Sequence, residues 1–234
     1  MQFMNAAYPI ASVAELIGEP ARSRMLIAVL DGRALPAGEL ARIAGVSAQS
    51  ASGHLSKLVD GGLLAVQNEG RHRYYRVAKP EVAHALEALG AISTVSRQPT
   101  MPRDRESQAL CAARSCYDHL AGRVAVELAE AMKSAKVIAP TGERCYILGP
   151  RGKQWFTKLG VDVDALRHSR RSFARQCLDW TERKPHLAGA LGAALCSRFL
   201  LLGWIARRPR TRALRITHRG ARELHNRFGI TSQT

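Results

Sequence analysis

The second half of the chain carries the same short motifs twice, and this repeat limits the possible folds more than any other feature. The tetrapeptide His-Leu-Ala-Gly occurs at 119–122 and again at 186–189. A Cys-x-Asp motif precedes each copy, at 116–118 and at 177–179, with six extra residues before the second tetrapeptide. A duplicated sequence predicts two similar structural units, which we expect to pack about a pseudo-twofold axis.

The two copies predict the same order of elements. A helix starts near each His-Leu-Ala-Gly motif and runs to Val137 or Trp204. A short strand pair follows, near 144–148 and 213–216, and a last helix ends each copy. This order is similar to half of a degenerate winged helix. We therefore expect a C-terminal domain at 109–234, with repeats at 109–165 and 170–234.

Charge divides the chain near residue 95. Residues 1–95 hold 9 Lys and Arg against 8 Asp and Glu, whereas residues 96–234 hold 26 against 11. The segment around this change is polar and contains Pro99 and Pro102, so we predict a linker at 95–108 after an N-terminal domain at 1–94. A net charge of +16 favours a polyanionic partner, and nucleic acid more than a membrane surface.

Cysteine usage and hydropathy favour a cytoplasmic protein. The 5 cysteines are odd in number and irregularly spaced, which argues against a disulfide framework. No signal-peptide pattern is found at the N-terminus. The longest apolar run, 187–206, contains Arg198, so it predicts a buried helix and no membrane span. The high content of Arg and Ala suggests a bacterial source.

The first ninety residues predict a winged helix-turn-helix. Helices are expected at 10–17, from Pro20 onward, at 37–44 and at 48–59, with Gly45 at the turn and Ser47 as the N-cap of the fourth. Strands at 63–66 and 73–77 are separated by a turn at 68–70. A final helix at 80–92 carries an apolar stripe that we assign to dimerisation, because a small domain leaves little for it to pack on. The whole chain is thus expected to be α+β and mainly α.

Residues 10–95 resemble the arsenical-resistance repressor (ArsR) family of bacterial regulators, over about a third of the chain. The matching motifs are Pro-Ala-Arg at 20–22, Glu-Leu-Ala at 39–41, Val-Ser at 46–47, Ser-Gly-His-Leu-Ser-Lys-Leu at 52–58, Gly-Gly-Leu-Leu at 61–64 and Gly-Arg-His-Arg-Tyr-Tyr at 70–75. Longer members of the family carry an appended domain. The resemblance implies a homodimeric, usually repressing protein that binds double-stranded DNA and is released by a small effector.

The resemblance does not supply the effector. The family's thiol site needs cysteines on the third helix, and residues 39–44 contain none. The family's zinc site pairs acidic residues and histidines on the last helix. Here that helix offers Glu81, His84 and Glu87 without the required spacing.

The fourth helix and the wing supply the candidate DNA contacts. The N-terminal exposed residues of a recognition helix enter the major groove, where Gln49 can pair with an adenine edge and Ser50 can donate or accept. Basic residues of a wing reach phosphates or an adjacent minor groove. The alternative is a solvated helix face. The candidate set is Ser47, Gln49, Ser50, Ser52, His54, Lys57, Arg71, His72, Arg73 and Tyr74.

The repeated motifs supply a candidate sensor. Pseudo-twofold packing brings together Cys116, Asp118, His119, Cys177, Asp179 and His186. Two thiolates with His or Asp suit zinc or another thiophilic metal, and Cys116 and His119 are expected one helical turn apart. The six-residue insertion argues against this. The alternatives are a thiol-based switch, or packing cysteines, capping aspartates and buried histidines beside a site for an organic effector.

Arginines form two further groups in the second half. Arg207, Arg208, Arg210, Arg212 and Arg215 surround Pro209 at the second strand pair, where a wing-like tip can touch flanking DNA. The arginines at 167, 170, 171 and 175 can instead hold an anionic effector. A solvated basic face is the third interpretation.

We expect a transcriptional regulator rather than an enzyme. A Cys-His-Asp nucleophilic site is disfavoured, because adjacent positions on one helix rarely give the required geometry. The glycine-containing segment at 149–153 lacks the spacing of a phosphate-binding loop. The favoured function is a dimeric repressor whose operator affinity is changed by an effector in the C-terminal domain. The alternative is a constitutive architectural DNA-binding protein without an effector.

Overall fold

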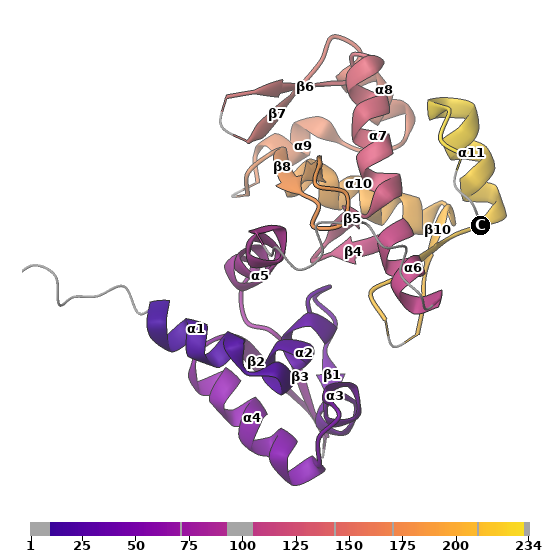
Figure 1. The fold of residues 1–234 in the computed structure, drawn as a ribbon. Coiled ribbons are helices and arrows are strands. Elements are labelled where there is room, and N and C mark those ends of the chain that lie inside the picture. The colour runs from indigo at the N-terminus through magenta and orange to yellow at the C-terminus, as the bar shows by residue number, and fades with distance from the viewer. Residues whose placement is uncertain are drawn as a thin grey trace, which may run out of the picture. The chain divides into compact units, whose positions relative to one another are not determined.

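The computed structural model describes residues 10–70, 72–92, 105–142, 144–169, 171–209 and 211–231 (Figure 1). The chain divides into two compact units, Met1–Leu86 and Glu87–Thr234. Most of the predicted linker lies outside the described residues, and its last four residues begin helix α6 (Arg105–Ala112), so the predicted domain boundaries stay a prediction. Within these ranges, no helix has the length and apolarity needed to cross a membrane.

The first unit is a winged helix-turn-helix, as the sequence predicts. Its elements are α1 (Ile10–Gly18), α2 (Pro20–Ala28), β1 (Leu35–Pro36), α3 (Ala37–Ala44), α4 (Ala48–Asp60), β2 (Leu64–Glu69), β3 (His72–Val77) and the start of α5 (Pro80–Ile92). The three strands form one sheet in the order β1-β3-β2. The predicted turn at 68–70 is wrong, because β2 continues to Glu69, which pairs with His72.

Local signals position the helices of the first unit. The carboxylate of Glu19 accepts hydrogen bonds from two backbone N–H groups at the start of α2. Gly45, at φ 71°, ends α3 in the left-handed conformation that glycine adopts without strain. The core contains Met25, Leu26, Leu40, Leu55 and Leu58, each fully buried. This packing fixes which face of α4 remains outside.

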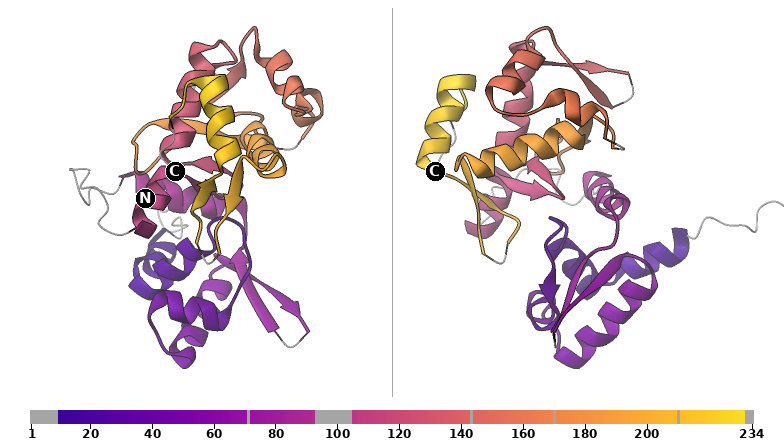
Figure 2. Two further views of the ribbon diagram at one scale, coloured as in Figure 1. Left: turned by 90° about the vertical axis from the view of Figure 1, so that its right-hand side faces the viewer. Right: turned by 180° about the vertical axis from the view of Figure 1, so that it is seen from behind.

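The second unit contains the predicted structural repeat, preceded by α6. The first repeat consists of β4 (Arg114–Cys116), β5 (His119–Ala121), α7 (Arg123–Ser134), β6 (Ile138–Thr141), β7 (Cys145–Leu148) and α8 (Gly152–Lys158), followed by α9 (Val163–Arg167). The second consists of β8 (Arg175–Leu178), β9 (Pro185–Ala188), α10 (Gly189–Leu201), β10 (Ile205–Arg207), β11 (Leu214–Ile216) and α11 (His218–Phe228) (Figure 2). The sequence prediction missed β4–β5 and β8–β9, the hairpins that open each repeat.

The two repeats exchange equivalent contacts. Helix α7 packs against β9, and α10 packs against β5. Strand β7 of the first repeat pairs with β8 of the second repeat. The equivalent contact is a bridge between Arg114, in β4 of the first repeat, and Ala213, next to β11 of the second. Backbone hydrogen bonds repeat this exchange, from Ser115 N to Arg212 O and from Gln176 N to Arg144 O. The repeats therefore interlock, as expected for packing about a pseudo-twofold axis.

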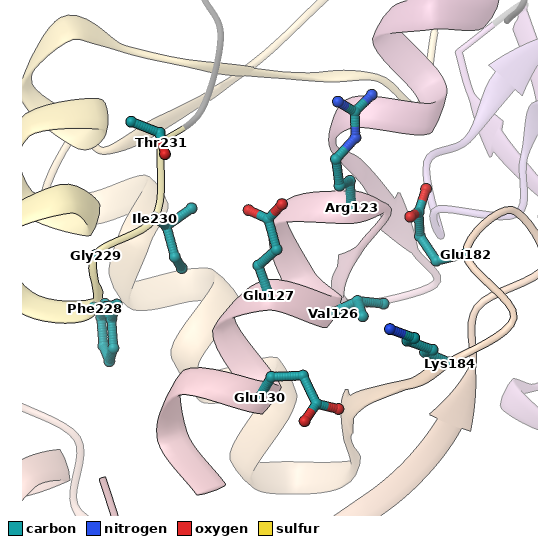
Figure 3. A pocket seen from close by; sticks show the side chains of 10 residues that line it. All are labelled: Arg123, Val126, Glu127, Glu130, Glu182, Lys184, Phe228, Gly229, Ile230 and Thr231. Atoms are coloured by element: carbon teal, nitrogen blue, oxygen red, sulfur yellow. The ribbon is translucent and has the colours of Figure 1, made fainter. Parts of the chain in front are cut away.

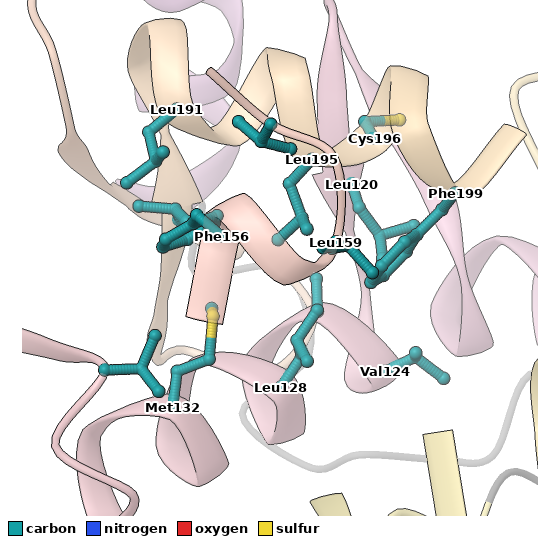
Figure 4. Close-up of a cluster of buried hydrophobic side chains, with 14 of the residues drawn as sticks. Leu120, Val124, Leu128, Met132, Phe156, Leu159, Leu191, Leu195, Cys196 and Phe199 are labelled. Atoms are coloured by element: carbon teal, nitrogen blue, oxygen red, sulfur yellow. The ribbon is translucent and has the colours of Figure 1, made fainter. Parts of the chain in front are cut away.

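One apolar core joins both repeats. Side chains of α7 and α10 meet those of α8 in this core, as the close-up in Figure 4 shows. Its buried members include Leu128, Met132, Phe156, Leu195 and Phe199. Because both halves contribute to one core, neither repeat buries its apolar face alone.

The glycine of each His-Leu-Ala-Gly motif is required by the backbone. Gly122 and Gly189 have φ values of 88° and 80°, which L side chains rarely adopt. A Cβ atom at Gly122 would lie 2.8 Å from the carbonyl oxygen of Cys111, and one at Gly189 would lie 2.7 Å from that of Ser172. The equivalent crowding explains why glycine recurs at both positions.

We expect Gly122→Ala and Gly189→Ala each to lower the free energy of unfolding by about 2–5 kcal/mol, because backbone strain and overpacking add. Urea denaturation measures the change. Gly53→Ala is the control, since nothing lies within 4 Å of a Cβ atom there and its φ is not in the positive range. Unfolding curves of the two variants that coincide with the parent's would contradict this account of the motif.

Candidate functional site

Helix α4 presents most of the predicted DNA-contacting residues to solvent. Gln49, Ser50 and Ser52 are exposed in its first turns, and Lys57 is exposed further along. The Oγ of Ser47 caps the helix by accepting a hydrogen bond from the N–H of Ser50 at 3.1 Å. The cap fixes the start of α4, so the exposed polar side chains leave from a rigid helix end.

The remaining predicted DNA contacts differ in how exposed they are. His54 is half-buried, and its Nδ1 lies 3.5 Å from Oε2 of Glu19. His72 and Arg73 are exposed on β3, whereas Tyr74 is half-buried. Arg71 lies outside the part of the chain that the structure describes. Among the predicted wing contacts in the described residues, His72 and Arg73 are the exposed ones.

The four repeated cysteines and histidines meet in the second unit. One ligand atom from each of Cys116, His119, Cys177 and His186 lies within 4.8 Å of the other three. The two Sγ atoms are 3.9 Å apart, and the imidazole centroids are 5.1 Å apart. All four residues are buried. We refer to these four residues as the Cys₂His₂ cluster.

Each hairpin supplies one cysteine and one histidine to the Cys₂His₂ cluster. Cys116 pairs with His119 across β4–β5, and Cys177 pairs with His186 across β8–β9. The predicted helical spacing of Cys116 and His119 is therefore wrong: they face each other on neighbouring strands. The insertion does not separate the second pair, because the extra residues lie in the loop between β8 and β9.

Small side chains leave room for the Cys₂His₂ cluster. Ala121 and Ala188 are buried and pack with the two cysteines. They belong to the two His-Leu-Ala-Gly motifs, one in each hairpin. This packing explains why alanine recurs in both motifs, as the crowded backbone explains the glycine.

Asp118 and Asp179 each contact one histidine of the Cys₂His₂ cluster but are not members of the cluster. Asp118 Oδ1 lies 3.2 Å from Nδ1 of His119, and Asp179 Oδ2 lies 3.5 Å from Nδ1 of His186. The aspartate of each Cys-x-Asp motif thus lies beside the histidine of the same hairpin. Nδ1 of each imidazole therefore lies beside a carboxylate, and Nε2 is the nitrogen that can bind another group.

Each aspartate has an arginine partner. Arg114 donates to Asp179 at 2.9 Å, and both side chains are fully buried. Arg171 lies 2.6 Å from Oδ2 of Asp118 at a partly exposed position. The sequence analysis missed Arg114, although an Arg-x-Cys-x-Asp pattern occurs at 114–118 and at 175–179 and could have indicated it.

The surroundings of the Cys₂His₂ cluster distinguish its two thiols. The hydrogen bond between them holds the pKa of Cys177 well below its usual range, and nearby imidazoles lower it further. The same bond, together with burial, raises the pKa of Cys116. Burial lowers the pKa of His119, but its bond to Asp118 and its contact with Cys177 outweigh this and raise the pKa to about 9.

Three nitrogen atoms of the Cys₂His₂ cluster lack hydrogen-bond partners: Nε2 of His119 and both ring nitrogens of His186. A buried polar atom without a partner costs free energy, so these nitrogens are expected to bind a further group, such as a water molecule or an ion. Two thiols and two imidazoles are the donor types that bind zinc and other thiophilic metals. The same thiols are close enough to react with each other if oxidised.

The other three cysteines lie apart from the Cys₂His₂ cluster. Cys196 is buried in the core of α10, where burial raises the pKa of its thiol to about 11. Cys111 and Cys145 are half-buried in α6 and β7. They serve as natural controls for the reactivity of the clustered thiols.

The structure divides the predicted arginine groups: Arg207, Arg208 and Arg215 are exposed near the second strand pair, whereas other members bind neighbouring groups. Arg212 is buried, and its guanidinium donates to Glu87 at 3.1 Å and to the carbonyl oxygen of Ser115. It is therefore not part of an exposed tip. In the second group Arg171 binds Asp118, and Arg167 stacks on the ring of Phe173. Arg170 and Arg210 fall outside the described ranges.

An open cleft of about 560 Å³ lies elsewhere in the second unit (Figure 3). It is lined by α7, by the end of α11 and by the loop between β8 and β9. Glu182 and Lys184 come from this loop, between Cys177 and His186 in the sequence. No sequence signal predicted this cleft, because its walls are far apart along the chain.

Comparisons with known proteins identify the chain's relatives. A family model described as a helix-turn-helix domain matches residues 17–67. The uncharacterized HTH-type transcriptional regulator YdfF of Bacillus subtilis is 43% identical over 211 residues, covering 90% of this chain and 93% of YdfF. CmtR of Mycobacterium tuberculosis, also an HTH-type transcriptional regulator, is 38% identical over 80 residues, covering 34% of this chain and 67% of CmtR.

Similar solved structures match about a third to two fifths of the chain. The homodimeric winged helix-turn-helix domain of Mb0332 from Mycobacterium bovis, a possible ArsR-family regulator, is 26% identical, with a TM-score of 0.35; the match covers 38% of this chain and 83% of that one. The relatives confirm the expectation of a regulator rather than an enzyme. The chain belongs to the HTH-type transcriptional regulators, with a winged helix-turn-helix in its first unit and an appended second unit.

Proposed function

We propose that this regulator is a dimeric repressor that reads its operator with α4 and the β2–β3 wing. The observation that carries the proposal is the exposed polar face at the start of α4, which Gln49, Ser50 and Ser52 form. These side chains leave a helix whose opposite face, with Leu55 and Leu58, is packed in the core. A recognition helix needs this combination of a rigid position and free polar ends.

A dimer is supported by α5 and by a relative. Leu89 and Ile92, near the end of α5, are 46% and 74% exposed. Apolar side chains on a helix favour burial against another copy. Mb0332 is described as homodimeric. In such a dimer two α4 helices enter successive major grooves, about 34 Å apart, and the operator is an imperfect palindrome.

Effector binding belongs to the second unit in this proposal. The Cys₂His₂ cluster and the open cleft both lie there. CmtR is described as a cadmium sensor, which supports a metal as one effector class. Its match covers 40% of this chain.

The double variant Gln49→Ala/Ser50→Ala tests the proposed reading surface. It is expected to weaken operator binding about 10- to 100-fold, because base-edge contacts are lost, and to leave binding to unrelated DNA unchanged. Fluorescence anisotropy on both DNAs measures the effect. Lys57→Ala is the matched control on the same helix: as a phosphate contact it weakens both DNAs alike and lowers the salt dependence.

The result also separates the repressor from a constitutive architectural protein. An architectural protein shows weak sequence preference and a steep salt dependence, and no small molecule changes its affinity. Equal affinity of the parent for operator and unrelated DNA would support that alternative. An unchanged preference in the double variant would remove Gln49 and Ser50 from the reading surface.

A further inference from the structure

We propose that Cys116, His119, Cys177 and His186 form a tetrahedral binding site for one divalent metal ion of the zinc class, shared by the two repeats. The idea that this ion is the effector rests on the proposed function. The existence of the site is argued from the geometry of the second unit. The site lies outside the winged helix, and none of its four residues is a candidate DNA contact.

The spacing of the donors fits a metal ion. Zinc–sulfur bonds are about 2.3 Å long, so two thiolates on one tetrahedral ion lie about 3.8 Å apart. The observed distance between the Sγ atoms of Cys116 and Cys177 is 3.9 Å. A disulfide would need about 2.05 Å. The distance between the two sulfurs therefore matches that of two thiolates on one ion, and the two sulfurs are not bonded to each other.

The histidines are oriented as metal ligands. Asp118 and Asp179 lie beside Nδ1 of His119 and His186, at 3.2 and 3.5 Å. Metal-binding histidines commonly present one nitrogen to the ion and the other to a carboxylate, which fixes the ring and its tautomer. The two Nε2 atoms are buried without a partner. An ion at the centre of the cluster would satisfy both.

The charges also favour a zinc-class ion. Two thiolates neutralise a divalent cation, and two neutral imidazoles complete the shell. The neighbouring carboxylates are balanced by Arg114 and Arg171, so the buried site carries no net charge. Sulfur and imidazole donors exclude magnesium and calcium, which take oxygen ligands. Zinc, cobalt and cadmium are the divalent ions that fit.

The ion would join the two repeats directly. The β4–β5 hairpin and the β8–β9 hairpin belong to separate sheets, although β5 and β9 are in contact. Each hairpin contributes one thiol and one imidazole, so neither repeat holds a complete site. This division gives a physical reason for the recurrence of cysteine, aspartate and histidine in both copies.

Native mass spectrometry of the full-length protein, as purified and after treatment with a dithiol chelator, tests the site. We expect one zinc ion per chain, removed by the chelator. Cys116→Ser and His186→Ala are expected to lose the ion, because each removes one ligand. Cys196→Ser is the matched control: it removes a buried cysteine outside the cluster and is expected to keep one ion per chain.

Cobalt(II) keeps the proposal testable if a ligand variant does not fold. Adding it to chelator-treated parent protein is expected to give the intense visible bands of a tetrahedral ion and thiolate-to-cobalt charge transfer, saturating at one equivalent. Absence of these bands, or a bare mass under every condition, would overturn the proposal. So would a mass two hydrogens lighter, which indicates a disulfide, together with a peptide map that assigns it to Cys116 and Cys177. Loss of sequence preference in the Gln49/Ser50 variant tests the DNA proposal independently.

Discussion

Removal of the metal ion from the Cys₂His₂ cluster is expected to lower the free energy of unfolding of the second unit by at least about 5 kcal/mol. Structural zinc contributes more than this to small metal-dependent domains, and here the core shared by the repeats supplies the rest of the stability. A loss of this size lowers the melting temperature by about 10–20 °C. Circular dichroism melts with and without a dithiol chelator measure it.

Two controls make this result specific. The chelator is expected to leave the melt of Cys116→Ser unchanged, since that variant lacks the ion from the start. In Cys196→Ser the chelator is expected to act as in the parent. Superimposable melts of the parent with and without chelator would show that the ion contributes nothing to stability, even if it binds.

The same samples test whether the ion is the effector. If its removal changes the DNA-binding geometry, the affinity for the operator should change about 5- to 150-fold, the range of typical allosteric coupling. Binding to unrelated DNA is the internal control. Equal operator affinity with and without the ion would make the cluster a structural site and direct the search for an effector to the open cleft.

The winged helix could be predicted from sequence because its signals are local. Pro20, Gly45 and Ser47 mark helix ends by their backbone and capping chemistry. The structure places α2, α3 and α4 at the expected positions. The wing hairpin was predicted, but its turn was placed too early. The strands continue to Glu69 and His72, and no side-chain pattern separates an exposed strand end from a turn.

The members of the Cys₂His₂ cluster were predicted, but their arrangement was not. The repeat indicated that the cysteines and histidines would meet. It did not indicate hairpins, because β4 and β5 are 3 residues long, too short to show the alternation of a strand. The roles of Asp118 and Asp179 beside the histidines followed only from the register of these hairpins.

Contacts between distant segments that no repeated motif links could not be predicted. The buried pair of Arg212 and Glu87 joins residues 125 positions apart. A run of arginines around Pro209 has the composition of a solvated tip, and only the fold shows that Arg212 points inward. The open cleft could not be predicted for the same reason, because its walls (α7, the end of α11 and the β8–β9 loop) are far apart in the sequence.

Asp179→Ala is expected to lower the free energy of unfolding by about 3–5 kcal/mol, because it leaves the fully buried guanidinium of Arg114 without its counter-charge. The carboxylate also accepts hydrogen bonds from the backbone N–H groups of Gly122, Thr181 and Glu182. These bonds tie the β8–β9 loop to the start of α7. Burial opposes ionisation of Asp179, but Arg114 and the other donors hold its pKa well below the usual range.

A double-mutant cycle in urea separates the ion pair from the other bonds. Arg114→Met alone is also expected to destabilise, because the carboxylate of Asp179 is then buried without its arginine. The double variant Arg114→Met/Asp179→Ala should be more stable than the sum of the two losses predicts, since no unpaired buried charge remains. Additive losses would mean that Arg114 and Asp179 act independently. The loss that remains in the double variant combines the loop hydrogen bonds of Asp179 with the contacts that Arg114 makes with Leu110 and Trp180.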